Sequence, residues 1–225
     1  MMGQILDNKT FYSSESVDEF FSLLEQEKIR YVLIKNIKNE LPEALKKGKD
    51  IDIVVHPEDY KLYQNVMARH HYIRLIHPEG RGAGWRFLYG MDENVKYQHL
   101  RTGIQVDAYA QLCTKSICMN AWLPLEKEIN RAVWENKVWN DEKKWWEINE
   151  EVLILYLVTR SIFEKQRFTE EYIEEIEKRK KLLCKPTVQG FFEKVFFRFT
   201  NELIALIEAR RYEEIIGRYM RFEDY

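Results

Sequence analysis

The chain has 225 residues, of which 45% are hydrophobic and 32% charged, and 35 basic residues nearly balance 37 acidic ones, leaving a formal net charge of −2. This composition is typical of one sizeable globular domain or two small ones, and it excludes a disordered or collagen-like chain. Because neither half of the sequence has a basic excess, the charge predicts no nucleic-acid partner and no anionic membrane surface.

The N-terminal part, to about residue 109, alternates helix and strand patterns. Ser16 and Glu19 form a capping-box pattern, which predicts a helix carrying apolar residues at helical spacing. The apolar run at 31–35 (YVLIK) predicts a buried strand, and the run at 50–55 (DIDIVV) predicts a second strand after a polar loop.

Further elements are expected before residue 110. Pro57 opens a predicted helix that runs toward Arg69, with Leu62 and Val66 facing inward and Tyr63 as a further candidate for the inner face. Short apolar runs predict additional strands at 73–76, 85–89, 96–100 and 104–109. The short connection at 101–103 between the last two strands predicts a hairpin turn.

The C-terminal part has a different pattern. In a tryptophan-rich stretch, residues 132–139 (AVWENKVW) predict a small hairpin. Asn149 and Thr169 are expected to cap two helices, and Pro186 begins a third that continues through Leu206. The fold class expected from these elements is α+β, with a helical C-terminal part.

Acidic residues follow the period of two of the predicted strands. In 50–55, Asp50 and Asp52 share one face and the isoleucines the other, and in 104–109 Asp107 likewise lies opposite the apolar residues. If these two strands are neighbours, the three carboxylates converge. The alternative is that each aspartate only solvates an exposed face.

Three converging carboxylates would repel one another unless a cation lay between them. Oxygen ligands without His or Cys favour Mg²⁺ or Mn²⁺ over zinc. A carboxylate-bridged pair of such ions, about 3.5–4 Å apart, clamps the attacking and leaving oxygens in phosphoryl transfer. Asp50 and Asp52 are therefore candidate ligands of a nucleotide-bound ion, and Asp107 is a candidate ligand of a second ion and a candidate base toward an acceptor hydroxyl.

The succession YVLIK (31–35), DIDIVV (50–55) and IQVDAY (104–109) resembles the nucleotidyltransferase superfamily with the DNA polymerase β-like fold, and within it uncharacterised bacterial nucleotidyltransferase-like proteins. Residues 135–163 also resemble their linker and first C-terminal helix. The resemblance implies a mixed β-sheet domain over 1–120 and a mainly helical domain over 121–225 that begins with a tryptophan-rich linker. It also implies a nucleotidyltransferase that is Mg²⁺- or Mn²⁺-dependent and takes an NTP as donor.

The sequence departs from this family after the first strand. Members have Gly-Ser, or at least Gly, where this chain has Lys35 and Asn36. Asn tolerates a left-handed backbone, and Lys35 offers a cation to phosphates in place of backbone amides. The departure supports an alternative in which a catalytically inactive module senses nucleotide or binds a protein.

Two arginines are further candidates for the donor phosphates. Arg81 lies within a glycine cluster at 80–84 and Arg86 follows it; the cluster is either a phosphate-binding loop or a plain connection between strands. His99 shares the acidic face only if the hairpin turn has three residues, so its role stays open.

The expected partners follow from charge, hydropathy and cysteine spacing. The acceptor is expected to be a small molecule, a sugar or a protein, with no nucleic acid and no membrane involved, since no apolar run is long enough to span a bilayer.

The N-terminus lacks the regions of a secretion signal and the three cysteines match no metal or redox spacing, so a cytoplasmic location is expected. The phenylalanine-rich stretch at 191–199 is expected to form core, with a homodimer surface as the alternative.

Overall fold

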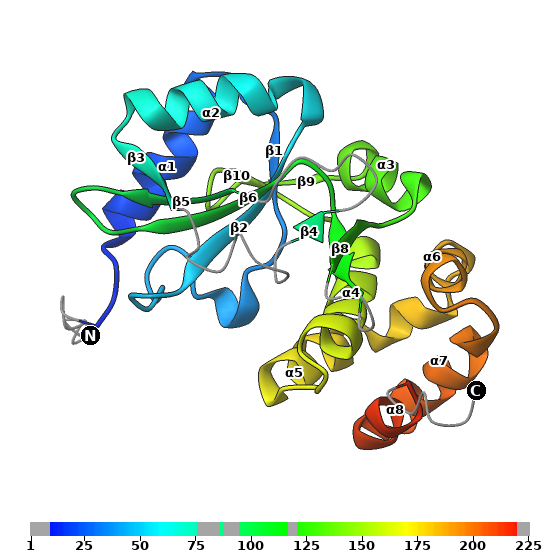
Figure 1. The fold of residues 1–225 in the computed structure, drawn as a ribbon. Coiled ribbons are helices and arrows are strands. Elements are labelled where there is room, and N and C mark those ends of the chain that lie inside the picture. The colour runs from blue at the N-terminus through cyan, green and yellow to red at the C-terminus, as the bar shows by residue number, and fades with distance from the viewer. Residues whose placement is uncertain (1–9, 76–85, 88–94, 117–120, 220–225) are drawn as a thin grey trace. The chain divides into compact units, whose positions relative to one another are not determined.

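The computed structural model describes residues 10–75, 86–87, 95–116 and 121–219 (Figure 1). The chain divides into two compact units. The first comprises Met1–Arg81, Met91–Gln111 and Lys137–Glu147, and the second comprises Gly82–Gly90, Leu112–Asn136 and Ile148–Tyr225. The predicted α+β class, with a mixed sheet and a helical C-terminal part, is confirmed. The domain division at residue 120 stays a prediction, since compactness does not show which segments fold independently.

A seven-stranded mixed sheet, in the order β3-β5-β6-β2-β1-β10-β9, forms the centre of the first unit. Its strands are β1 (Tyr31–Leu33), β2 (Asp50–Val55), β3 (Tyr72–Leu75), β5 (Val95–His99), β6 (Gln105–Tyr109), β9 (Val138–Asn140) and β10 (Trp145–Glu147). At the centre of the sheet β2 runs parallel to β6 and antiparallel to β1. The strand that carries two of the candidate aspartates is therefore the direct neighbour of the strand that carries the third.

Two helices, α1 (Ser14–Gln26) and α2 (Tyr60–Arg69), cover one face of this sheet (Figure 1). Apolar side chains of α1, α2 and the sheet form one core, which includes Phe20, Phe21, Leu24, Tyr63, Val66, Met67, Ile51, Ile53, Val55, Val106 and Ala108. Burial on this scale supplies most of the free energy that holds a helix on a sheet. The helices thereby fix which face of β2 and β6 is apolar.

Two details of these helices differ from the sequence prediction. The capping box at Ser16 was wrong, because Ser13 is the N-cap of α1 and its hydroxyl accepts a hydrogen bond from the Ser16 backbone N–H. Leu62 was predicted to face inward but is 41% exposed. The inward positions of Tyr63 and Val66 are confirmed, and Tyr60 and Met67 are buried beside them. A short 3-10 turn over Pro57–Asp59 precedes α2.

The hairpin predicted at 132–139 was also wrong. Its first residues belong to α3 (Lys127–Glu135), and the actual hairpin is formed by β9 and β10. The apolar spacing Ile129, Ala132 and Val133 buries one helical face, and this helical period outweighs the local strand pattern. β10 then joins the first unit by pairing in parallel with β1.

The second unit contains a three-stranded sheet in the order β4-β8-β7, together with the remaining helices. Its strands are β4 (Arg86–Phe87), β7 (Cys113–Lys115) and β8 (Ala121–Pro124). Its helices are α3, α4 (Glu150–Thr159), α5 (Glu170–Arg179), α6 (Pro186–Phe196), α7 (Thr200–Glu208) and α8 (Tyr212–Tyr219). The predicted cap of α4 is confirmed, since the Asn149 side chain accepts hydrogen bonds from the Glu151 and Val152 backbone N–H groups.

The third predicted helix is interrupted. α6 ends at Phe196, and Phe197 has a φ of 51° and a side chain that is 72% exposed. Buried residues continue at helical spacing on both sides of the break, from Phe192 to Leu203, so the apolar pattern contains no sign of it. In the part of the chain that the structure describes, every helix falls short of the length and apolar character needed to cross a bilayer.

Candidate metal centre

The three aspartates converge on the face of the sheet opposite α1 and α2. In the parallel pair β2–β6, Asp52 lies directly beside Asp107, and Asp50 lies beside Gln105. One carboxylate oxygen from each of Asp50, Asp52 and Asp107 lies within 4.8 Å of the others. The predicted convergence of these three carboxylates, called the triad below, is confirmed.

Two lysines from the flanking strands contact the triad. Lys35, just beyond β1, forms an ion pair with Asp52, whose side chain is 3% exposed. On the other side, Lys96 of β5 places its Nζ 2.8 Å from Asp50 Oδ2 and 3.7 Å from Asp107 Oδ1. Two ammonium groups thus face three carboxylates, and one negative charge is left over when all three acids are ionised.

The protonation of the triad is uneven. Burial, followed by the negative charges of Asp50 and Asp52, raises the pKa of Asp107 to about 8. Burial acts in the same direction on Asp50, but the hydrogen bond and charge of Lys96 outweigh it and lower the pKa of Asp50 below its usual value. Asp107 is therefore the member of the triad that binds a proton most readily.

A buried oxygen of Asp107 tests whether the triad suits a metal ion. Asp107 Oδ1 is buried and has no hydrogen-bond partner among the described residues. An orphaned buried acceptor is costly, and a cation bound there would satisfy it. The donors are carboxylate oxygens alone, the ligand type that Mg²⁺ and Mn²⁺ prefer. The residues therefore fit a hard divalent cation.

The raised pKa of Asp107 predicts a pH-dependent stability in the absence of divalent ions. Between about pH 4 and pH 8 the folded chain keeps a proton on Asp107 that the unfolded chain releases near its ordinary pKa of about 3.9. The contribution of Asp107 to the free energy of unfolding therefore falls as the pH rises through this window. Asp107→Asn has no ionisable group at this position and should not lose stability in this way as the pH rises.

Thermal melts in EDTA check this prediction. We expect Asp107→Asn to match the wild type at pH 5 and to melt a few degrees higher at pH 8.5, since about 1 kcal/mol shifts the Tm of a chain of this size by roughly 2–4 °C. Excess Mn²⁺ at pH 8.5 should stabilise the wild type more than the variant, because the variant has lost one of the three carboxylates. A wild type that is as stable as the variant at pH 8.5 without metal contradicts the prediction.

The other residues predicted to bind nucleotide are placed differently. Asn36 has a φ of −132° and is not left-handed; the positive φ values of this loop occur at Lys38 and Asn39. The Asn36 side chain instead accepts a hydrogen bond from the Leu41 backbone N–H at 3.0 Å and closes the loop. Arg86 lies in β4 of the second unit, and Arg81 lies outside the described residues.

Sequence reasoning missed Lys96, because the register of the β5–β6 hairpin decides which side chains join the triad. The His99 backbone N–H donates to the Ile104 carbonyl, so the loop spans 100–103 and is one residue longer than the expected turn. His99 consequently faces the opposite side and packs on the Tyr72 ring, while Lys96 pairs with Asp107. The one available signal was the alternation of Lys96 and Gln98 along the strand, which predicts a shared face but not which one.

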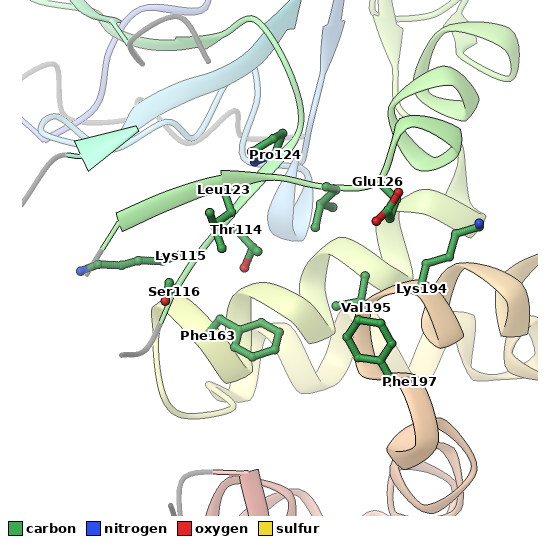
Figure 2. Close-up of a pocket in the computed structure, with 11 residues that line it drawn as sticks. Thr114, Lys115, Ser116, Leu123, Pro124, Glu126, Phe163, Lys194, Val195 and Phe197 are labelled. Atoms are coloured by element: carbon green, nitrogen blue, oxygen red, sulfur yellow. The ribbon is translucent and has the colours of Figure 1, made fainter. Parts of the chain in front are cut away.

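A separate pocket of about 380 Å³ lies wholly in the second unit. Figure 2 shows Phe163, Val195 and Phe197 from its helices on one side, and Thr114 and Leu123 from β7 and β8 on the other. None of the residues that line it is a sequence candidate for catalysis, metal binding or nucleotide binding. The triad, in the first unit, is thus the site where the predicted chemistry gathers.

Known proteins resemble this chain in structure but not in sequence. No protein-family model matches the sequence, and no curated protein does. The solution structure of the antibiotic-resistance factor ANT(2'')-Ia is similar with a TM-score of 0.49 and 11% identity, over 88% of this chain and 96% of that one. A crystal structure of ANT(2'')-Ia in complex with adenylyl-2''-tobramycin gives 0.48 and 11%, over 82% and 96%. An antigenic nucleotidyltransferase-like protein from Paracoccidioides brasiliensis gives 0.44 and 10%, over 90% and 95%. The third of these structures is described as a nucleotidyltransferase-like protein, the class that the sequence resemblance implies.

Proposed function

We propose that the triad holds Mg²⁺ or Mn²⁺ and that the chain transfers a nucleotidyl group from an NTP to a hydroxyl of a small molecule, a sugar or a protein. The observation that carries this proposal is the convergence of Asp50, Asp52 and Asp107 from two parallel strands. A divalent ion bound there supplies charge stabilisation to a transferring phosphoryl group. The net charge of −2 also favours an acceptor other than a nucleic acid, whose phosphates normally require an excess of cations.

Each carboxylate has a distinct role in this proposal. Asp50 and Asp52 hold the cation at the donor phosphates, and Asp107 also faces the acceptor. The acceptor oxygen forms a bond to the α-phosphorus, the bond from that phosphorus to the pyrophosphate oxygen breaks, and Asp107 accepts the hydroxyl proton. The position of Asp107 beside Asp52, on the face of the sheet where the cation would bind, supports this role as general base.

The remaining candidates supply charge to the phosphates. Lys35 is the cation already at the triad, and Arg81, Arg86 and Asn36 are proposed as further phosphate contacts. We place the reaction in the cytoplasm, with a homodimer as the proposed assembly.

A second candidate function is an inactive module that senses nucleotide. Two observations favour it: Lys35 and Lys96 already neutralise most of the triad, and the Asn36 side chain is engaged with Leu41 where a phosphate-binding turn would be expected. Such a module would bind an NTP with a divalent ion but would release no pyrophosphate.

An assay of pyrophosphate release tests both functions. The protein is incubated with each of the four NTPs, Mn²⁺ and a panel of aminoglycosides, sugars and proteins, and NTP binding is measured in parallel by calorimetry. Metal-dependent pyrophosphate release with a labelled acceptor supports the transferase. Metal-dependent binding without release across the panel supports the sensor, and the absence of metal-dependent binding contradicts both.

A further inference from the structure

Lys96 occupies an unusual position in the sheet. It projects from β5, whose neighbour β6 carries Asp107 directly opposite it, and its ammonium group also reaches Asp50 on β2, one strand further. The 2.8 Å contact with Asp50 Oδ2 is a charge-assisted hydrogen bond, and the 3.7 Å approach to Asp107 Oδ1 is an ion pair. A positive charge thus lies between two carboxylates from different strands.

The two lysines at the triad differ in their exposure. Lys35 is 15% exposed and pairs with an almost fully buried aspartate, whereas the Lys96 side chain is 37% exposed. A lysine with over a third of its side chain in solvent can withdraw its ammonium group into water at little cost. Lys96 is therefore the more easily displaced of the two cations.

The contacts of Lys96 also coincide with the contacts that a cation would make. Asp107 Oδ1, the buried oxygen without a hydrogen-bond partner, is the one that Lys96 approaches without reaching hydrogen-bond distance. A divalent ion brought into contact with Asp50 and Asp107 would therefore meet the ammonium group of Lys96. The ion and the ammonium group would repel each other strongly at such a site, where water is partly excluded.

We infer that Lys96 is the resident counter-ion of the triad: it holds Asp50 and Asp107 together when no metal is bound, and a divalent ion must displace it. It is a positioning residue that sets the metal affinity of the site. The inference rests on the proposed function only for the identity of the ion. It explains how three carboxylates can be assembled without a metal and yet remain available to one.

The consequence is that removing the positive charge should strengthen metal binding. Lys96→Met leaves the triad with one lysine, so the divalent ion no longer competes with a tethered cation. We expect the Kd for Mn²⁺, measured by calorimetry without nucleotide, to decrease at least about 10-fold. Lys96→Arg keeps the charge and should bind Mn²⁺ as weakly as the wild type.

Lys49→Met is the matched control. Lys49 is 41% exposed and pairs with Glu40 at 2.5 Å in the same unit, so its removal alters a similar ion pair and the same net charge. We expect this variant to change the Kd for Mn²⁺ less than about 2-fold. The comparison separates competition at the triad from a general effect of charge.

The outcomes distinguish this inference from the proposed function. Tighter Mn²⁺ binding by Lys96→Met alone supports the inference, as does binding by this variant when the wild type shows none. Unchanged, weaker or absent binding by Lys96→Met overturns it, and so does equal tightening by Lys96→Arg or Lys49→Met. If Lys96→Met does not fold, Lys96→Gln provides the same test. The Mn²⁺ titrations contain no nucleotide and are independent of the NTP assay. A wild type that binds Mn²⁺ in the titrations but releases no pyrophosphate in the NTP assay therefore contradicts the transferase proposal alone.

Discussion

Asp52→Asn is expected to lower metal-dependent nucleotidyl transfer by at least about 10³-fold. Asp52 is the most buried member of the triad and lies between Asp107 on β6 and Lys35 beyond β1. The substitution keeps the size of the side chain but removes the negative charge that the cation needs. A metal ion is worth several kcal/mol of transition-state stabilisation, and each 1.36 kcal/mol corresponds to a factor of ten in rate.

The test is the rate of pyrophosphate release, with circular dichroism to verify that the variant is folded. Glu40→Gln is the matched control, because Glu40 is an acidic partner of a lysine in the same unit but is not part of the triad. The control should keep its activity within about 2-fold. Retention of more than a tenth of the wild-type rate by Asp52→Asn contradicts the proposed role of the triad.

Trp145→Ala is expected to lower the free energy of unfolding by about 3–5 kcal/mol, the range for truncation of a buried aromatic side chain. Trp145 is fully buried in β10, its ring centroid lies 4.6 Å from that of Phe21 on α1, and its indole N–H donates to Glu147 Oε1 at 2.7 Å. The residue thus fastens the strand that pairs with β1 to the helix covering the sheet. Its loss leaves a large cavity in the core of the first unit.

Urea denaturation measures this effect, and Trp139→Ala is its control. Trp139 lies on the neighbouring strand β9, is only partly buried, and donates its indole N–H to the exposed Asp141. Its removal should cost about 1 kcal/mol or less. Equal losses for the two variants would show that Trp145 does not have the anchoring role that its burial indicates.

The shared face of the triad residues could be predicted from the sequence, because the alternation of side chains along a strand does not depend on how that strand pairs with its neighbours. On a half-buried strand the period of two fixes which residues share a face, so Asp50, Asp52 and Asp107 had to lie opposite the isoleucines and Val106 once the strands formed. Only their adjacency was an assumption, and the parallel β2–β6 pair provides it. The capping side chain of Asn149 was predictable for a similar reason, since a cap is decided within a few residues.

The features that escaped prediction depend on events outside the local sequence. One extra residue in the loop at 100–103 moves His99 away from the triad and brings Lys96 to it, and no pattern within the strands reveals the loop length. The interruption at Phe197 lies within an unbroken apolar period, so the pattern favours one continuous helix. The Asn36 side chain closes its loop by accepting a hydrogen bond from the Leu41 backbone N–H. The backbone preference of Asn alone does not predict this contact, because it depends on where Leu41 lies in the folded loop.

The most direct test of the metal-centre account is an anomalous difference map from crystals of the full chain soaked with Mn²⁺ and a non-hydrolysable ATP analogue. The account predicts a Mn²⁺ peak in contact with carboxylate oxygens of the triad, with the Lys96 ammonium group withdrawn from Asp50. Bound analogue with no Mn²⁺ peak at Asp50, Asp52 and Asp107, or with the ion held by other residues, would contradict it.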